Sequence, residues 1–99
     1  MKIHWTRESL DRLAEIEDFI AKDNAERAAK FVDELIAHAN AVLPGEPRAG
    51  RMVPEISNPD IRELLYRKYR IVYRVRKGSV EILTVFEGRR LLRVDEIGP

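Results

Sequence analysis

The stretch from residue 61 to residue 90 constrains the fold of this chain more than any other segment. Apolar residues alternate with arginine in a first run and with glutamate or other residues in a second, and the short segment Lys77-Gly78-Ser79 separates the two runs. Alternation with a period of two places one set of side chains on a core and the other toward solvent. The central glycine indicates a hairpin turn. The stretch predicts two or three antiparallel strands. Their solvent face is either a row of guanidinium groups that recognises an anionic surface or an ordinary polar sheet face.

The two runs predict specific faces for their side chains. In the first run, one face is expected to hold Tyr69, Ile71, Tyr73 and Val75, and the other Arg70, Val72, Arg74 and Arg76. In the second run, one face is expected to hold Val80, Ile82, Thr84 and Phe86, and the other Glu81, Leu83, Val85 and Glu87. The apolar residues Leu91, Leu92 and Val94 indicate a last short strand or a tail.

The residues before this stretch predict a strand, two helices and a loop. Residues 1–5 resemble a strand, and Thr6 is a suitable N-cap for a helix whose apolar stripe contains Leu10, Leu13, Ile16 and Ile20. Asp23 and Glu26 have the spacing of a capping box for a second, alanine-rich helix, which Pro44-Gly45 would end. Residues 44–60 contain four of the five prolines and predict a long loop.

The order β-α-α-β-β-β predicts an α+β fold. We expect an antiparallel sheet of about four strands with an N-terminal helical hairpin packed on one face. Ninety-nine residues suit one domain spanning residues 1–99, and an apolar content of 44% is enough for a single core.

Composition narrows the classes of function. The chain has no cysteine, which excludes disulfides and thiolate metal sites. His4 and His38 form no spaced ligand pair, so neither a metal nor a cofactor is expected. No apolar run approaches the roughly 18 residues of a membrane span, and no signal-peptide pattern opens the chain. A cytoplasmic protein with no membrane contact is the expectation.

Charge is segregated along the chain, although the net charge is only +1. Residues 8–34 contain nine acidic and four basic residues, whereas residues 61–93 contain ten basic and three acidic ones. Such segregation predicts one acidic and one basic side. The basic side could meet nucleic acid or an acidic protein segment.

Taken in order, several short motifs resemble the ParE/RelE superfamily of type II toxins, also called plasmid stabilisation proteins, and are closer to ParE. The resemblance covers nearly the whole chain. It rests on Trp5-Thr6, Ala28, Phe31, the loop from Pro47 to Gly50-Arg51, and the segments 61–64, 69–73, 80–85 and 88–90. It implies a toxin that inhibits growth until a cognate antitoxin binds it, in a toxin–antitoxin hetero-oligomer. ParE-like members poison DNA gyrase, whereas RelE-like members cut mRNA on the ribosome.

The cutting chemistry needs a base for the RNA 2′-hydroxyl, cations around the phosphate and an acid for the leaving oxygen. The resemblance matches Arg70, Arg89 and Arg90 to family arginines and Arg62 to one of two lysines. Leucine occupies the place of the second lysine, and no tyrosine or histidine follows Tyr73. Glu87 stands where many relatives have histidine and could serve as a base. A nuclease would therefore use Arg62, Arg70, Glu87 and Arg90.

Three functions follow from the resemblance. The first is ParE-like poisoning of gyrase, which the missing acid–base pair favours and which would make the chain a protein inhibitor instead of an enzyme. The second is RelE-like endoribonuclease activity on ribosome and mRNA, which the arginines favour. The third is a degenerate member that only binds antitoxin. Under the first function, Arg62, Arg70, Arg89 and Arg90 are expected to contact the target. An antitoxin is expected in a groove between the helical hairpin and the sheet.

Overall fold

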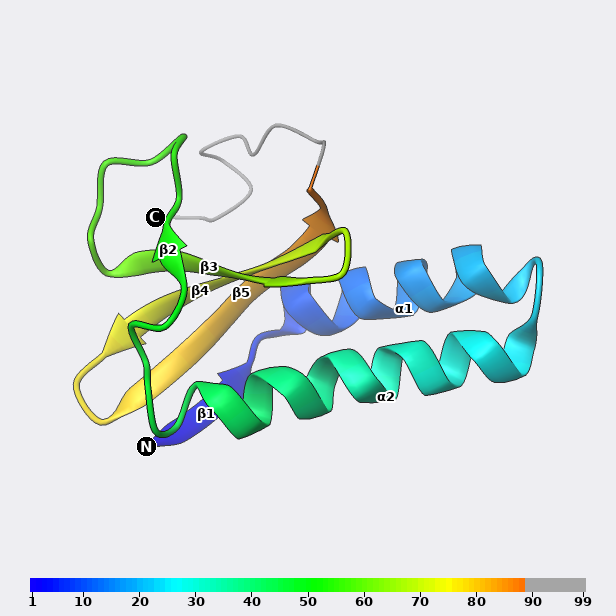
Figure 1. The fold of residues 1–99 in the computed structure, drawn as a ribbon, viewed down its shortest axis with the longest axis horizontal. Coiled ribbons are helices and arrows are strands. Elements are labelled where there is room, and N and C mark those ends of the chain that lie inside the picture. Colours follow the sequence, from blue (N-terminus) through cyan, green and yellow to red (C-terminus); the bar gives the residue numbers. More distant parts are fainter. Residues whose placement is uncertain (89–99) are drawn as a thin grey trace.

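The computed structural model describes residues 1–88, which form two helices and five strands (Figure 1). Arg89 and Arg90 and the apolar residues expected in a last strand or tail lie outside the described residues. The elements are β1 (Lys2–Trp5), α1 (Arg7–Ala21), α2 (Ala25–Val42), β2 (Arg51–Met52), β3 (Ile61–Tyr66), β4 (Tyr69–Arg76) and β5 (Ser79–Glu87).

The strands form one sheet in the order β1-β5-β4-β3-β2. The predicted α+β class and the helical hairpin on one face are confirmed. Two details differ from the prediction. The described sheet has five strands because the two residues of β2 pair with β3, and β1 runs parallel to β5 while the other pairs are antiparallel. The helical hairpin follows β1 and returns the chain to the opposite edge of the sheet, so β1 meets β5 and not its sequence neighbour (Figure 1).

The helices begin at polar caps. The Thr6 hydroxyl accepts a hydrogen bond from the Ser9 amide at 3.2 Å, which confirms the predicted cap of α1. The predicted cap of α2 is wrong by one residue: Asn24 has extended backbone and its side chain accepts from the Arg27 amide at 2.9 Å. Asp23 therefore lies outside the cap. Within residues 1–88, neither helix is long and apolar enough to cross a membrane.

The sheet buries apolar residues on both faces. The helices cover one face, where the core contains Leu13, Leu35, Ile71, Tyr73 and Ile82. A smaller cluster on the other face contains Val53, Ile61, Val72, Leu83 and Phe86. Val53 belongs to the loop before β3, so this loop covers part of the sheet face on which β4 carries its arginines. The predicted helical stripe is wrong at Leu10, which is 48% exposed.

A β-bulge in β5 changes the faces predicted for that strand. Tyr73 is opposite Ile82 and Val72 is opposite Thr84, so Leu83 is an extra residue in β5. Beyond the bulge the alternation is reversed: Val85 joins the helix-covered core and Phe86 joins the opposite cluster. The prediction that Phe86 shares a face with Ile82 is therefore wrong.

The bulge also anchors α1. The Thr6 hydroxyl donates a hydrogen bond to the Ile82 carbonyl at 2.7 Å, and the Thr6 amide donates to the same oxygen at 3.2 Å. One threonine thus caps the helix and fixes its start on the central part of the sheet.

The turn between β4 and β5 agrees with the sequence. Arg76 pairs with Ser79, and Gly78 has a φ of +79°, which favours glycine. The predicted hairpin at Lys77-Gly78-Ser79 is confirmed.

Candidate functional site

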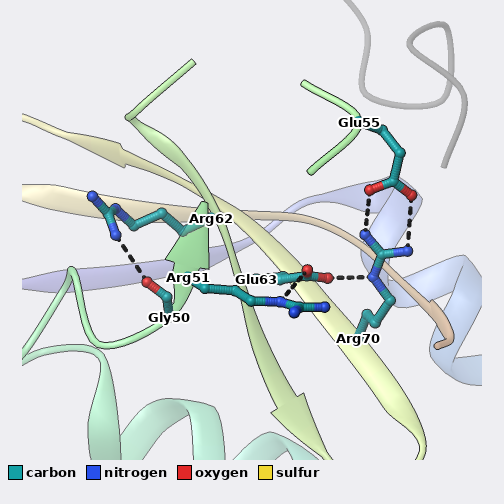
Figure 2. Close-up of polar contacts among 6 residues, drawn as sticks. All are labelled: Gly50, Arg51, Glu55, Arg62, Glu63 and Arg70. Atoms are coloured by element: carbon teal, nitrogen blue, oxygen red, sulfur yellow. Dashed lines mark hydrogen bonds and ion pairs between the residues drawn. The ribbon is translucent and has the colours of Figure 1, made fainter. Parts of the chain in front are cut away.

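A buried ionic cluster joins β3, β4 and the loop before β3 (Figure 2). The terminal nitrogens of Arg70 donate to the two carboxylate oxygens of Glu55 at 3.0 and 2.9 Å, and its Nε donates to Glu63. The Glu63 side chain is 0% exposed and also accepts from Arg51 Nε at 2.8 Å. Arg70 itself is only 5% exposed, so the prediction of a solvent-facing guanidinium at this position is wrong.

The loop explains why Arg70 is buried. Arg70 lies on the predicted face of β4, but the loop before β3 covers that face and supplies Glu55. The guanidinium also lies over the Phe86 ring, 4.9 Å from its centroid. Burial alone lowers the pKa of Arg70, but the hydrogen bonds with Glu55 and Glu63 outweigh it and raise the pKa above its ordinary value. The group is therefore a fixed cation inside an ionic network.

Arg62 has a comparable role on the opposite face of β3. Its Nη1 donates to the Gly50 carbonyl at 2.9 Å (Figure 2). Its Nε donates to the Pro59 carbonyl at 3.0 Å. The Gly50 amide in turn donates to the Tyr73 hydroxyl at 2.9 Å. Arg62 therefore fastens to the sheet the residue before β2 and the end of the loop before β3.

A side chain at position 50 would disrupt this attachment. A Cβ there would lie 2.4 Å from the Glu63 carbonyl oxygen and 2.7 Å from the Tyr73 hydroxyl. Glycine is thus required by close approach of the loop to β3 and β4.

The residues expected to form a nuclease do not converge in the part of the chain that the structure describes. Arg70 is opposite Leu65 and Phe86, whereas Arg62 is opposite Tyr73 and Glu87 is opposite Tyr69. Because neighbours along a strand point to opposite faces, Arg62 and Glu87 lie on the helix-covered face and Arg70 on the other. Arg90, the fourth member, lies outside the described residues, as does Arg89.

The buried tyrosines do not replace the missing base. Burial raises the pKa of Tyr73, and burial followed by the nearby Glu87 carboxylate raises the pKa of Tyr69. Both phenols therefore stay protonated at neutral pH.

A groove lies between α1 and the ends of β4 and β5. Its volume is about 230 Å³, and its walls are largely apolar. Apolar, aromatic and charged side chains line it: Arg12, Glu15, Ile16, Phe19, Tyr69, Val85, Phe86 and Glu87. Phe19 is 66% exposed, an unusual state for a phenylalanine on a small domain. The Nε of Arg12 is buried and has no hydrogen-bond partner among the described residues. The groove expected between the hairpin and the sheet is therefore present.

Sequence reasoning missed Phe19. The signal was available, because Phe19 lies beside the apolar stripe of α1 and not within it. An aromatic residue outside the buried stripe of an amphipathic helix indicates an exposed contact.

Comparison with known proteins agrees with the fold and the motifs. The family model described as the ParE toxin of the type II toxin–antitoxin system parDE matches residues 3–92. A Sinorhizobium fredii protein named "Putative toxin Y4kP" is 36% identical over 93 residues, which cover 90% of each chain. A structure from the chromosomal ParDE TA system of P. aeruginosa has a TM-score of 0.72 and 26% identity, covering 88% of this chain and 95% of that one. The chain belongs to the ParE toxin family of type II toxin–antitoxin systems.

Proposed function

We propose that this chain is a toxin that inhibits growth by poisoning DNA gyrase through protein–protein contact, and that a cognate antitoxin neutralises it. Its family membership and its resemblance to ParE-like proteins support the proposal. The observation that carries the choice of target is the separation of Arg70 from Arg62 and Glu87 by the sheet.

The geometry opposes an mRNA nuclease for a chemical reason. In-line cleavage needs a base and phosphate-binding cations around one phosphate, within hydrogen-bond reach of the reacting atoms. Here the guanidinium of Arg70 binds Glu55 and Glu63, and the expected base Glu87 faces the helices. The RelE-like alternative would require these groups to leave their present partners.

Paired assays on the purified chain test the target. We expect loss of gyrase supercoiling activity or accumulation of gyrase–DNA breaks, with mRNA on programmed ribosomes intact. Ribosome-dependent cleavage of mRNA with unaffected gyrase would refute the proposal, and Glu87→Gln would then be the first variant to examine.

We assign the antitoxin to the groove between α1 and the sheet. The exposed Phe19 ring and the apolar walls suit the apolar face of an amphipathic helix. The Arg12 guanidinium already pairs with Glu8 and Glu15, so the apolar contacts carry this assignment. An antitoxin segment with apolar anchors fits this groove.

A pair of variants tests this assignment. Phe19→Ser removes a groove side chain, whereas Leu10→Ser removes a comparably exposed side chain outside the groove. With the cognate antitoxin as the ligand, Phe19→Ser should weaken binding at least roughly tenfold, as for an aromatic contact residue. Leu10→Ser should bind like the unmodified chain. Equal binding by both variants would place the antitoxin elsewhere.

A further inference from the structure

A second surface lies at the opposite end of the molecule from the turn between the helices. The β4–β5 turn and the N-terminus meet there (Figure 1). The loop before β3 packs on β3, β4 and β5 through Val53 and Glu55. Beside the β4–β5 turn, the sheet face that the helices do not cover carries charged side chains instead of an apolar cluster.

The strand register defines this surface. Lys2, Ser79 and Arg76 are neighbours across β1, β5 and β4, and the next row on the same face contains His4, Glu81 and Arg74. We call these six residues the basic platform. With neighbouring strands about 4.8 Å apart and alternate residues about 6.7 Å apart along a strand, it measures roughly 10 by 7 Å.

The platform has an excess of positive charge. Lys2, Arg74 and Arg76 are cationic and Glu81 is its one carboxylate. The Arg76–Glu81 pair, at 3.3 Å, is partly exposed and therefore weak. Lys2 and His4 are exposed.

Arg74 adds an unsatisfied donor. Its Nε is buried and has no hydrogen-bond partner among the described residues. The Arg74 guanidinium thus keeps a positive charge that its Nε shares with no acceptor in the described residues, which adds to the positive potential of the platform.

The platform contrasts with the groove. The groove has aromatic and apolar anchors, which are typical of protein contacts. The platform has cations from two strands, β1 and β4, and no Phe, Tyr or Trp, since Trp5 and Tyr73 point to the helix-covered face. Lysine and arginine without apolar anchors suit phosphate backbones, and the absence of Phe, Tyr and Trp from the platform disfavours single strands, whose bases stack on large aromatic groups.

We propose that the basic platform binds the phosphate backbone of duplex DNA without sequence preference. This inference is independent of the gyrase proposal, because the contact requires no other protein. With about three phosphates neutralised, the logarithm of the binding constant should fall with the logarithm of salt concentration with a slope of about −2.7.

Fluorescence anisotropy with a labelled 20-base-pair duplex tests the proposal. Between 50 and 200 mM salt the binding constant of the unmodified chain should fall about 40-fold. Lys2→Gln/Arg76→Gln should reduce the salt slope to about −1 and weaken binding at 50 mM salt roughly tenfold or more. The control Arg7→Gln/Lys30→Gln removes the same charge from helix positions whose side chains are 90% and 79% exposed, and should bind like the unmodified chain.

Three results would overturn the inference. The first is no duplex binding at 50 mM salt. The second is that the two double variants weaken duplex binding equally, or that neither weakens it. The third is platform-dependent binding of a polyglutamate peptide without duplex binding, which would assign the platform to an acidic protein. Circular dichroism of each variant confirms that the fold is retained before binding is compared.

Discussion

Replacing Arg70 should destabilise the fold strongly. Arg70→Met keeps most of the side-chain volume but removes the donor to Glu63, whose side chain is fully buried. The largely exposed Arg51 is then the remaining partner of Glu63 in the cluster, and breaking a buried ion pair costs about 3–5 kcal/mol. The free energy of unfolding of a chain this size is about 5–15 kcal/mol. The variant should therefore lose a large fraction of its stability, measured as the unfolding free energy in urea by circular dichroism.

A double variant separates the charge effect from lost packing. Arg70→Met/Glu63→Leu removes both buried charges, and replacing a buried pair by apolar residues is often neutral or stabilising. The double variant should therefore be more stable than Arg70→Met by at least about 2 kcal/mol. Arg76→Met, at a largely exposed position, should change the unfolding free energy by no more than about 0.5 kcal/mol. A loss below about 1 kcal/mol in Arg70→Met, or a double variant no more stable than the single one, would refute the reasoning.

Three further predictions concern the loop, the helix start and alkaline pH. Gly50→Ala should lower the unfolding free energy by at least about 2 kcal/mol, because its Cβ would lie 2.4 Å from the Glu63 carbonyl oxygen. The control Gly45→Ala meets nothing within 4 Å and should leave the unfolding free energy unchanged, and urea titrations of both variants check this. Thr6→Val should cost about 1–2 kcal/mol in the same assay and Thr6→Ser much less, since the hydroxyl serves both α1 and the bulge. Because the pKa of Tyr73 is raised in the folded state, the unfolded chain releases the phenol proton at lower pH than the folded chain does. The unfolding free energy should therefore decline above about pH 10. The decline should be less steep in Tyr73→Phe when unfolding is followed between about pH 8 and 12.

Much of the fold could be predicted from local patterns. The cap at Thr6, the turn at Gly78 and the two helices depend on neighbouring residues, so spacing and residue type were sufficient. The cap of α2 was assigned to Asp23 instead of Asn24, because both residues have cap-forming side chains and the sequence does not show which backbone is extended.

The errors arose from contacts between distant segments. The parallel pairing of β1 with β5 and the bulge at Leu83 depend on tertiary packing, which alternation does not encode. Arg70 was placed on the correct face, but its burial depends on Glu55 from a loop 15 residues earlier. A row of strand arginines was therefore read as a solvent face although part of it is an internal ionic network.

The role of the strand arginines changes accordingly. Target contact by Arg62 and Arg70 stays a prediction, and so does contact by Arg89 and Arg90, which lie outside the described residues. The structure gives the guanidinium groups of Arg62 and Arg70 internal partners. We therefore expect loss of toxicity in Arg70→Ala to follow from loss of the folded state.

Inhibition of gyrase supercoiling by the Arg70→Met/Glu63→Leu variant, compared with the unmodified chain at equal folded concentration, tests this account most directly. If Arg70 acts by holding the loop on the sheet, the stabilised double variant should inhibit gyrase within about threefold of the unmodified chain, a difference below 0.7 kcal/mol. A double variant that is folded but fails to inhibit, beside an unmodified chain that does inhibit, would show that Arg70 contacts the target and would contradict the account.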